Sequence, residues 1–217
     1  MAKDSTSWQM RQRIAQLAAA MMAEDGIHDF AYAKKKAGRQ LGAASADLPS
    51  NAEIEAEIRV YHELYNSDDQ PASLRQLRSD ALVVMQLLQR FNPHLTGAVL
   101  EGTAGKYAET HIHLFADSLK DVEIFLLNSQ VPYETNEKSY RVSGASEHRK
   151  GGERKKVPVF TLDGPNGLIR LSVFEVDGQR VPTKHAASGG NALRAGIEEV
   201  RALLREQATP DPQAALG

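Results

Sequence analysis

The sequence predicts an α+β fold, in which a helical N-terminal part is followed by a mixed or antiparallel sheet with helices. Through about residue 92, apolar residues recur at intervals of three and four, as they do on one face of a helix. After Pro93 the apolar residues alternate, which is typical of strands. The 217 residues, 41% hydrophobic and 25% charged, are enough to bury a core. We therefore expect a helical part at 1–92, an α+β domain at 93–206 and a disordered tail at 207–217.

The first two helices are predicted from apolar stripes and from residues that favour helix ends. Ser5 or Ser7 can accept the amide hydrogen bonds of the first turn, and Gly26 is expected to end the first helix. The second helix covers about 30–41 and is closed by Gly42 in a left-handed conformation. The stripe of the first helix contains Met10, Ile14, Leu17, Ala18 and Met21.

Two more helices follow. The third begins with a capping box, Ser50 to Glu53, and the fourth has Pro71 in its first turn. The apolar faces of these two helices contain Ile54, Ile58, Tyr61, Leu64 and Tyr65, and then Leu74, Leu77, Ala81, Val84 and Leu88.

The second half is predicted to mix strands with helices. Gly164-Pro165-Asn166-Gly167 is a hairpin turn between the last two strands. One helix is expected at 119–128, and a final one at about 192–206 with Asn191 as its cap. The charged run at 147–156 is expected to form a mobile loop. Strands are expected at 97–101, 110–115, about 133–142, 157–162 and 168–175.

Composition excludes several classes of protein. A net charge of −2 gives no overall positive field for nucleic acid or an anionic membrane. Without cysteine there are no disulfides and no thiolate-bound zinc. The start of the chain lacks the apolar run of a signal peptide or membrane span, so we expect a cytoplasmic protein that does not contact a membrane.

The stretch "GTAGKYAETHIH", residues 102–113, places a glycine-rich turn before a strand that carries His111 and His113. This layout resembles the nucleotidyltransferase superfamily, whose signature is a strand, a Gly-Ser turn and a second strand bearing Asp-x-Asp. Gly102-Thr103 stands at the position of the Gly-Ser, and the resemblance covers roughly 95–128. The runs "AEDGIHDFAYAKKKAGRQLG" and "LPSNAEIEAEIRVYHELY" are also similar to a group of uncharacterised bacterial proteins that carry a nucleotidyltransferase label.

The resemblance implies that the turn holds the phosphates of a nucleotide, with Arg170 on a later strand as a further phosphate contact. In the superfamily the two aspartates bind magnesium, but here both positions are histidine. Magnesium prefers oxygen ligands, so we do not expect it as a cofactor, whereas a nucleotide or zinc remains open. The turn residues in question are Gly102, Thr103, Gly105 and Lys106.

No third carboxylate is evident for metal chemistry. The strand at 168–175 has Arg170 and Ser172 at its central polar positions, and only Glu175 at its end. Asp163 lies in a turn and is a remote candidate.

Three interpretations of His111 and His113 stay open. Alternation along a strand puts both on one face, so they are either its polar side, a degenerate phosphate or nucleotide site, or two ligands of a transition metal such as zinc. Asp117 and Glu101 can complete a metal site only if the fold brings them close. His94, before the first strand, is a similar unknown.

The leading expectation for function is an atypical or catalytically degenerate nucleotidyltransferase-like protein. It is expected to bind a nucleotide, RNA or a protein partner through the turn, through His111 and His113 in the degenerate catalytic position, and through Arg170. The alternatives are an active metal-dependent nucleotidyltransferase, a transition-metal hydrolase that uses the histidines, and a structural protein whose helical half docks a partner.

Overall fold

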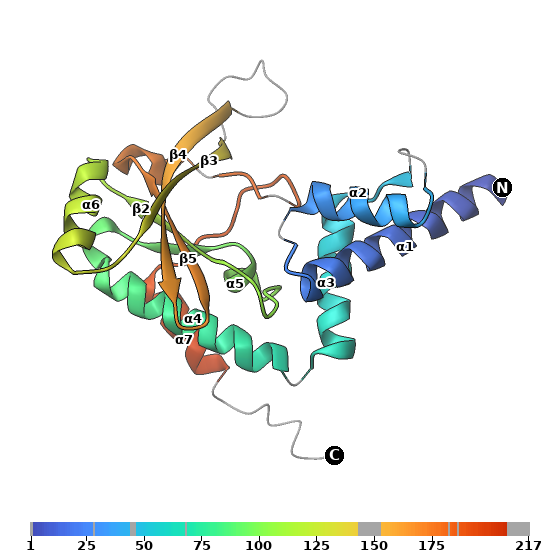
Figure 1. The fold of residues 1–217 in the computed structure, drawn as a ribbon, viewed down its shortest axis with the longest axis horizontal. Helices are drawn as coiled ribbons and strands as arrows, with labels where there is room; N and C mark the ends of the chain where they lie inside the picture. Colours follow the sequence, from blue (N-terminus) through green and yellow to red (C-terminus); the bar gives the residue numbers. More distant parts are fainter. Residues whose placement is uncertain are drawn as a thin grey trace, which may run out of the picture. The chain divides into compact units, whose positions relative to one another are not determined.

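The computed structural model describes residues 2–27, 29–43, 47–67, 69–142, 153–181, 183–185 and 187–207. In these residues it has seven α-helices and a five-stranded mixed sheet, which confirms the α+β class (Figure 1). The chain divides into two compact units. The first unit contains Met1–Leu74, Gly102–Ala108 and His185–Gly190, and the second contains Arg75–Glu101, Glu109–Lys184 and Asn191–Gly217.

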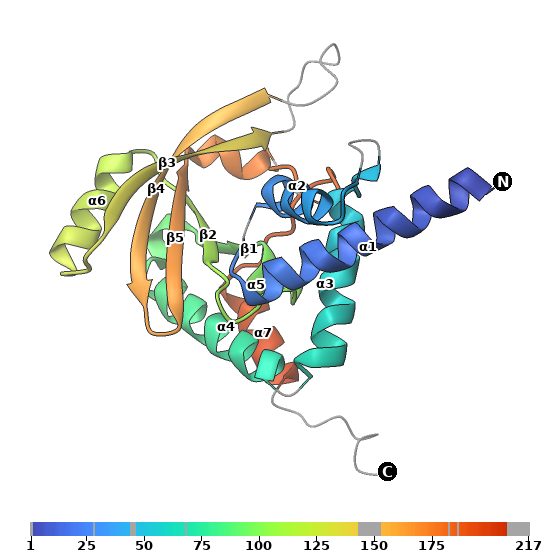
Figure 2. The same cartoon turned by 45° about the vertical axis from the view of Figure 1, so that its right-hand side comes forward.

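The first unit is built on three helices, α1 (Ala2–Glu24), α2 (Phe30–Gln40) and α3 (Asn51–Tyr65). Figures 1 and 2 show α2 and α3 packed against α1. Many core positions of α1 and α2 are alanines, whose small side chains allow the helices to approach closely. The core contains Ile14, Ala15, Ala18, Ala19, Met21, Ala33, Ala37, Ile54 and Ile58.

Local capping signals fix most ends of these helices. The capping box is present: the amide of Glu53 donates to the Ser50 hydroxyl, and the amide of Ser50 donates to the Glu53 carboxylate. Gly26 and Gly42 both have left-handed φ angles, +67° and +64°. The prediction of a Ser5 or Ser7 cap is wrong, because α1 begins at Ala2 and both residues lie inside it.

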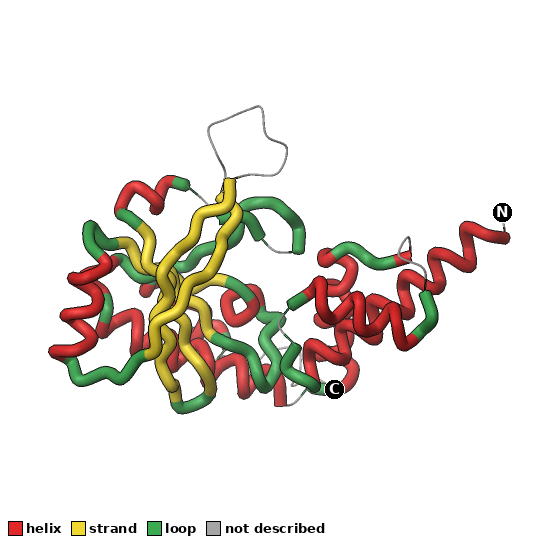
Figure 3. Tube along the Cα trace, turned by 45° about the horizontal axis from the view of Figure 1, so that its top comes forward, coloured by secondary structure: helices red, strands yellow, loops and turns green. Residues whose placement is uncertain are grey.

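The second unit contains the sheet, with strand order β1-β2-β5-β4-β3, drawn in yellow in Figure 3. Only β2 and β5 are parallel, and the other neighbours are antiparallel. Its strands are β1 (His94–Thr96), β2 (Thr110–Phe115), β3 (Glu134–Val142), β4 (Glu153–Gly164) and β5 (Gly167–Phe174). Its helical segments are η2 (Gln89–Phe91), α5 (Ala98–Glu101), α6 (Leu119–Asn128), η3 (Val176–Arg180) and α7 (Ile197–Glu206). A further helix, α4 (Asp69–Leu87), begins in the first unit and continues in the second.

The two faces of the sheet differ in polarity. One face is apolar, and the Tyr133 hydroxyl beside it donates to Glu123 of α6. Val122 and Leu126 of the same helix are fully buried. The register places the apolar side chains Leu95, Ile112, Leu114, Phe160, Leu162, Ile169, Leu171 and Val173 on that face. The opposite face carries the polar residues of β2 and β5, among them His111, His113 and Arg170.

One strand prediction and one loop prediction are corrected by the structure. The segment predicted as a strand at 97–101 is the short helix α5, and the strand lies before it, in β1. Gly97 has a φ of +73°, which ends the extended conformation there. Arg78 of α4 donates to the carbonyls of Val99 and Leu100, both at 2.9 Å, and so stabilises the helical turn. In the predicted loop at 147–156, residues 153–156 belong to β4, and the remainder lies outside the described residues.

The last helix begins later than predicted. Gly196 is the N-cap of α7, and its amide donates to the Glu199 carboxylate. Asn191, the predicted cap, instead forms a β-bridge with Lys184. The predicted tail, apart from Gln207, lies outside the described residues. Within the described part of the chain, no helix is long and apolar enough to cross a membrane.

Candidate functional site

The polar face of the sheet brings several predicted site residues together. Arg170 of β5 lies opposite His111, and Ser172 lies opposite His113, because β2 and β5 pair in parallel. Tyr140 of β3 shares this face, since its ring contacts that of His113. We call this the polar sheet face, formed by Glu109, His111, His113, Lys138, Tyr140, Arg170 and Ser172.

His113 is the largest of the fully buried polar side chains of this face. It is 1% exposed, and neither ring nitrogen has a hydrogen-bond partner among the described residues. Its ring centroid lies 5.4 Å from that of Tyr140 and 4.7 Å from that of Phe174. Burial holds the pKa of His113 well below its usual value, and the nearby positive charges, Arg194 first, act in the same direction. His113 is therefore a neutral imidazole whose two ring nitrogens are buried without a hydrogen-bond partner among the described residues.

Arg170 and Glu109 form a paired charge beside His111. Nε and Nη2 of Arg170 donate to the two carboxylate oxygens of Glu109, each at 2.6 Å. These hydrogen bonds raise the pKa of Arg170. Nε2 of His111 lies 3.9 Å from an oxygen of the same carboxylate. Arg170 was predicted as a phosphate contact. In the structure its guanidinium is paired with the carboxylate of Glu109, which the sequence did not indicate.

Lys138 and Tyr140 complete the face from β3. The hydroxyls of Tyr140 and Ser172 are 2.7 Å apart and hydrogen-bonded, and burial raises the pKa of Tyr140. Lys138 is an exposed residue of β3, and desolvation of its ammonium lowers its pKa. That ammonium lies 5.4 Å from the Tyr140 ring centroid.

Arg194 lies over the aromatic end of this face. Its guanidinium carbon is 5.2 Å from the ring centroid of Phe115 and 5.9 Å from that of Phe174. The guanidinium also donates to the carbonyls of Gln179 and Val181, at 3.2 and 3.3 Å. Arg194 was not among the predicted site residues, because the apolar spacing at about 192–206 predicts a helix there. No local signal indicated that it lies against β2 and β5.

The glycine-rich turn belongs to the first unit, whereas His111, His113 and Arg170 belong to the second. Nε2 of Gln70 donates to the carbonyls of Gly102 and Ala104, each at 3.0 Å. A Cβ on Gly105 would lie 3.1 Å from the carbonyl oxygen of Ala23, and Gly102 has a φ of +81°. Packing and backbone conformation thus account for both glycines.

The other two predicted turn residues also contact the first unit. The Lys106 ammonium lies 5.6 Å from the ring centroid of Tyr107. The backbone of Thr103 lies beside His62 and opposes the lowering of the His62 pKa, which comes mainly from burial.

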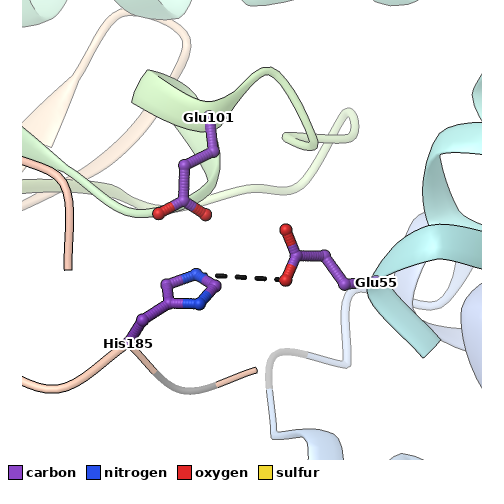
Figure 4. Close-up of side chains that lie close together, drawn as sticks. All are labelled: Glu55, Glu101 and His185. Carbon is purple, nitrogen blue, oxygen red and sulfur yellow. Dashed lines mark ion pairs between the residues drawn. The ribbon is translucent and has the colours of Figure 1, made fainter. Parts of the chain in front are cut away.

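A second polar cluster in the first unit was not predicted (Figure 4). Nε2 of His185 lies 4.0 Å from Oε2 of Glu55, an ion-pair contact drawn as a dashed line. The amide of Ser188 donates to Nδ1 of His185 at 3.1 Å, so a neutral ring carries its proton on Nε2, toward Glu55. Arg59 donates to the same carboxylate at 2.5 Å. Glu55 and His185 are far apart in the sequence, and no local pattern predicts their contact.

The remaining candidate residues have structural contacts. Nδ1 of His94 lies 2.9 Å from the carbonyl of Asn92, and Glu175 forms an ion pair with Lys155 at 3.0 Å. Asp163 lies in β4, opposite Leu168.

Compared with known proteins, the chain matches no family model and no curated sequence.

Proposed function

We propose that this protein is an atypical, catalytically degenerate nucleotidyltransferase-like protein that binds a nucleotide on the polar sheet face. The observation that carries the proposal is the group of cations, Lys138, Arg170 and Arg194, that this face gathers around the buried neutral imidazole of His113. The proposal rests on the sheet face alone and requires nothing of the glycine-rich turn.

The charges of the face favour an anionic ligand. Three cations, Lys138, Arg170 and Arg194, lie near His113 or beside it on the face. The negative charges that act on Arg170 are the carboxylates of Glu109 and Glu134, and both raise its pKa. A phosphate adds acceptors for the ammonium of the exposed residue Lys138, and charge-assisted hydrogen bonds of this kind are about twice as strong as neutral ones.

The same residues favour binding over metal-dependent transfer. The two positions that hold carboxylates in the superfamily are imidazoles, which are poor ligands for magnesium. Among the described residues, no third histidine or carboxylate converges with His111 and His113 in an arrangement suited to a metal ion. This supports a nucleotide-binding protein over a transition-metal hydrolase.

Titration calorimetry with nucleoside triphosphates, in buffer with EDTA, tests the proposal. We expect binding without a divalent metal, and about fivefold weaker binding by Lys138→Ala, the effect of losing about 1 kcal/mol. Lys156→Ala is the matched control, because Lys156 lies opposite Ser139 and therefore points to the other face of the same hairpin. Its affinity should equal that of the wild type.

Two outcomes would contradict this function. If no nucleotide binds at concentrations up to about 1 mM, the polar sheet face is not a nucleotide site. If magnesium is required and a nucleotidyl product forms, the protein is an active enzyme rather than a degenerate one.

A further inference from the structure

Strand β3 forms an open edge of the sheet. It is the last strand in the order β1-β2-β5-β4-β3, and its residues Glu134–Ser139 are exposed (Figure 2). An edge strand presents backbone N–H and C=O groups that a further strand can pair with.

Two observations identify the outward groups. Glu137 lies opposite Pro158 of β4, and proline has no N–H, so this pair does not exchange hydrogen bonds across the hairpin. In addition, the carbonyl of Arg141 accepts a hydrogen bond from the amide of Lys184 at 2.7 Å, on the side away from β4. Since backbone groups alternate along a strand, the N–H and C=O of Thr135, Glu137 and Ser139 also point outward.

The end of this edge is already paired with a short extended segment. Val142 forms an antiparallel bridge with Thr183, next to the hydrogen bond between Arg141 and Lys184. The edge therefore accepts an added strand at one end, and no described residue pairs with the stretch from Thr135 to Ser139 on that side.

We propose that this stretch pairs, antiparallel, with the same stretch of a second copy of the chain, about a two-fold axis at Asn136. In an antiparallel pair, side chains directly opposite each other lie on the same face. Side chains on one face of β3 are an even number of residues apart, so the two-fold axis must pass through a residue and not between two residues. At Asn136 the axis places Glu134 opposite Lys138 of the second copy, and Lys138 opposite Glu134. It also pairs the outward backbone groups of Thr135 with those of Glu137.

Neighbouring registers are disfavoured by charge or by occupied groups. An axis at Glu137 places this carboxylate opposite itself, and an axis at Lys138 does the same with two ammonium groups; like charges directly opposite are destabilising. An axis at Ser139 pairs Glu137 with Arg141, whose carbonyl is already bonded to Lys184. The axis at Asn136 therefore gives complementary charges and uses backbone groups that have no partner among the described residues.

Charged residues on an edge often prevent pairing, and here they favour the register at Asn136, which brings opposite charges together. The paired stretch is short, so the contact belongs to the small, weak class of interfaces. We expect reversible self-association that rises with protein concentration.

Sedimentation equilibrium of the full chain tests this inference by charge exchange. The wild type should rise from the monomer mass of 23.8 kDa toward twice that mass as the concentration approaches about 1 mM. Glu134→Lys alone and Lys138→Glu alone should remain monomeric, because each places like charges opposite each other. An equal mixture of the two variants should associate again, since each supplies the charge that the other needs.

Two control variants separate edge pairing from general effects. Glu137→Pro removes an outward N–H that makes no bond to β4, so it should abolish association and leave the circular dichroism spectrum unchanged. Lys120→Glu reverses an exposed charge on α6 and should leave association at the wild-type level. A wild type that stays monomeric up to about 1 mM, or a mixture that does not associate, overturns the inference.

Discussion

Arg170 and Glu109 form a two-point ion pair, in which Nε and Nη2 of the guanidinium each donate to one carboxylate oxygen at 2.6 Å. The parallel pairing of β2 with β5 places Arg170 opposite His111, and Glu109 directly precedes β2. This contact sets the charge of the polar sheet face, because the carboxylate neutralises the cation closest to it.

Replacing Glu109 with Gln should strengthen nucleotide binding. The amide removes a competing negative charge and leaves Arg170 with a full positive charge for the phosphates. We expect about threefold to tenfold tighter binding in calorimetry, and about 1 kcal/mol less stability in urea unfolding. Glu137→Gln, on the other face of the sheet, should change neither quantity. Unchanged or weaker nucleotide binding in Glu109→Gln would show that Arg170 does not contact the ligand.

His113 should make stability depend on pH. Its pKa in the folded protein is well below the ordinary value of 6.5, so below about pH 6.5 the unfolded chain binds a proton that the folded chain does not. Stability should therefore fall as the pH decreases through 6.5 toward the folded-state pKa, at up to about 1.4 kcal/mol per pH unit for this group.

The variant His113→Phe isolates this contribution. It keeps an aromatic ring against Tyr140 and Phe174 and removes the titration. The pKa of His62 is also lowered by burial, so the variant should retain a shallower pH dependence. Urea unfolding at pH 7.5 and pH 5 measures the difference. Parallel stability curves for the two proteins would rule out a depressed His113 pKa.

Gln70 should stabilise the glycine-rich turn. Its amide donates to the carbonyls of Gly102 and Ala104, and Gln70→Ala removes both hydrogen bonds. We expect a loss of about 1–2 kcal/mol in unfolding free energy and faster amide exchange at 102–108. Gln76→Ala is the control, because Gln76 is an exposed residue of the same helix. Equal stability of both variants would mean that the two contacts contribute nothing.

Arg78 should be required for the helical turn at α5. It is 6% exposed and donates to the carbonyls of Val99 and Leu100, and burial lowers its pKa. Arg78→Met keeps the buried stem but leaves both carbonyls without this donor, at a cost of about 2–4 kcal/mol. Arg75→Met, at an exposed position of α4, should cost less than about 0.5 kcal/mol. Chemical unfolding of the two variants checks this difference.

The elements that sequence analysis predicted well depend on contacts within a few residues. The Ser50 to Glu53 capping box, the helix ends at Gly26 and Gly42, and the hairpin turn at 164–167 are all local. The strand at 110–115 follows from alternation alone. The prediction at 97–101 was wrong because a residue of α4, Arg78, stabilises a helix in a segment whose own sequence favours a strand.

By itself, the sequence determined that His111 and His113 share one face of a strand, because side chains alternate in any strand. Only the tertiary structure decided what surrounds them. The pairing of β2 with β5 placed Arg170 and Ser172 opposite the two histidines, and burial made His113 neutral. The same packing of distant segments joined the glycine-rich turn to the helices of the first unit. Such contacts form between residues far apart in the chain, so no local periodicity or capping signal records them.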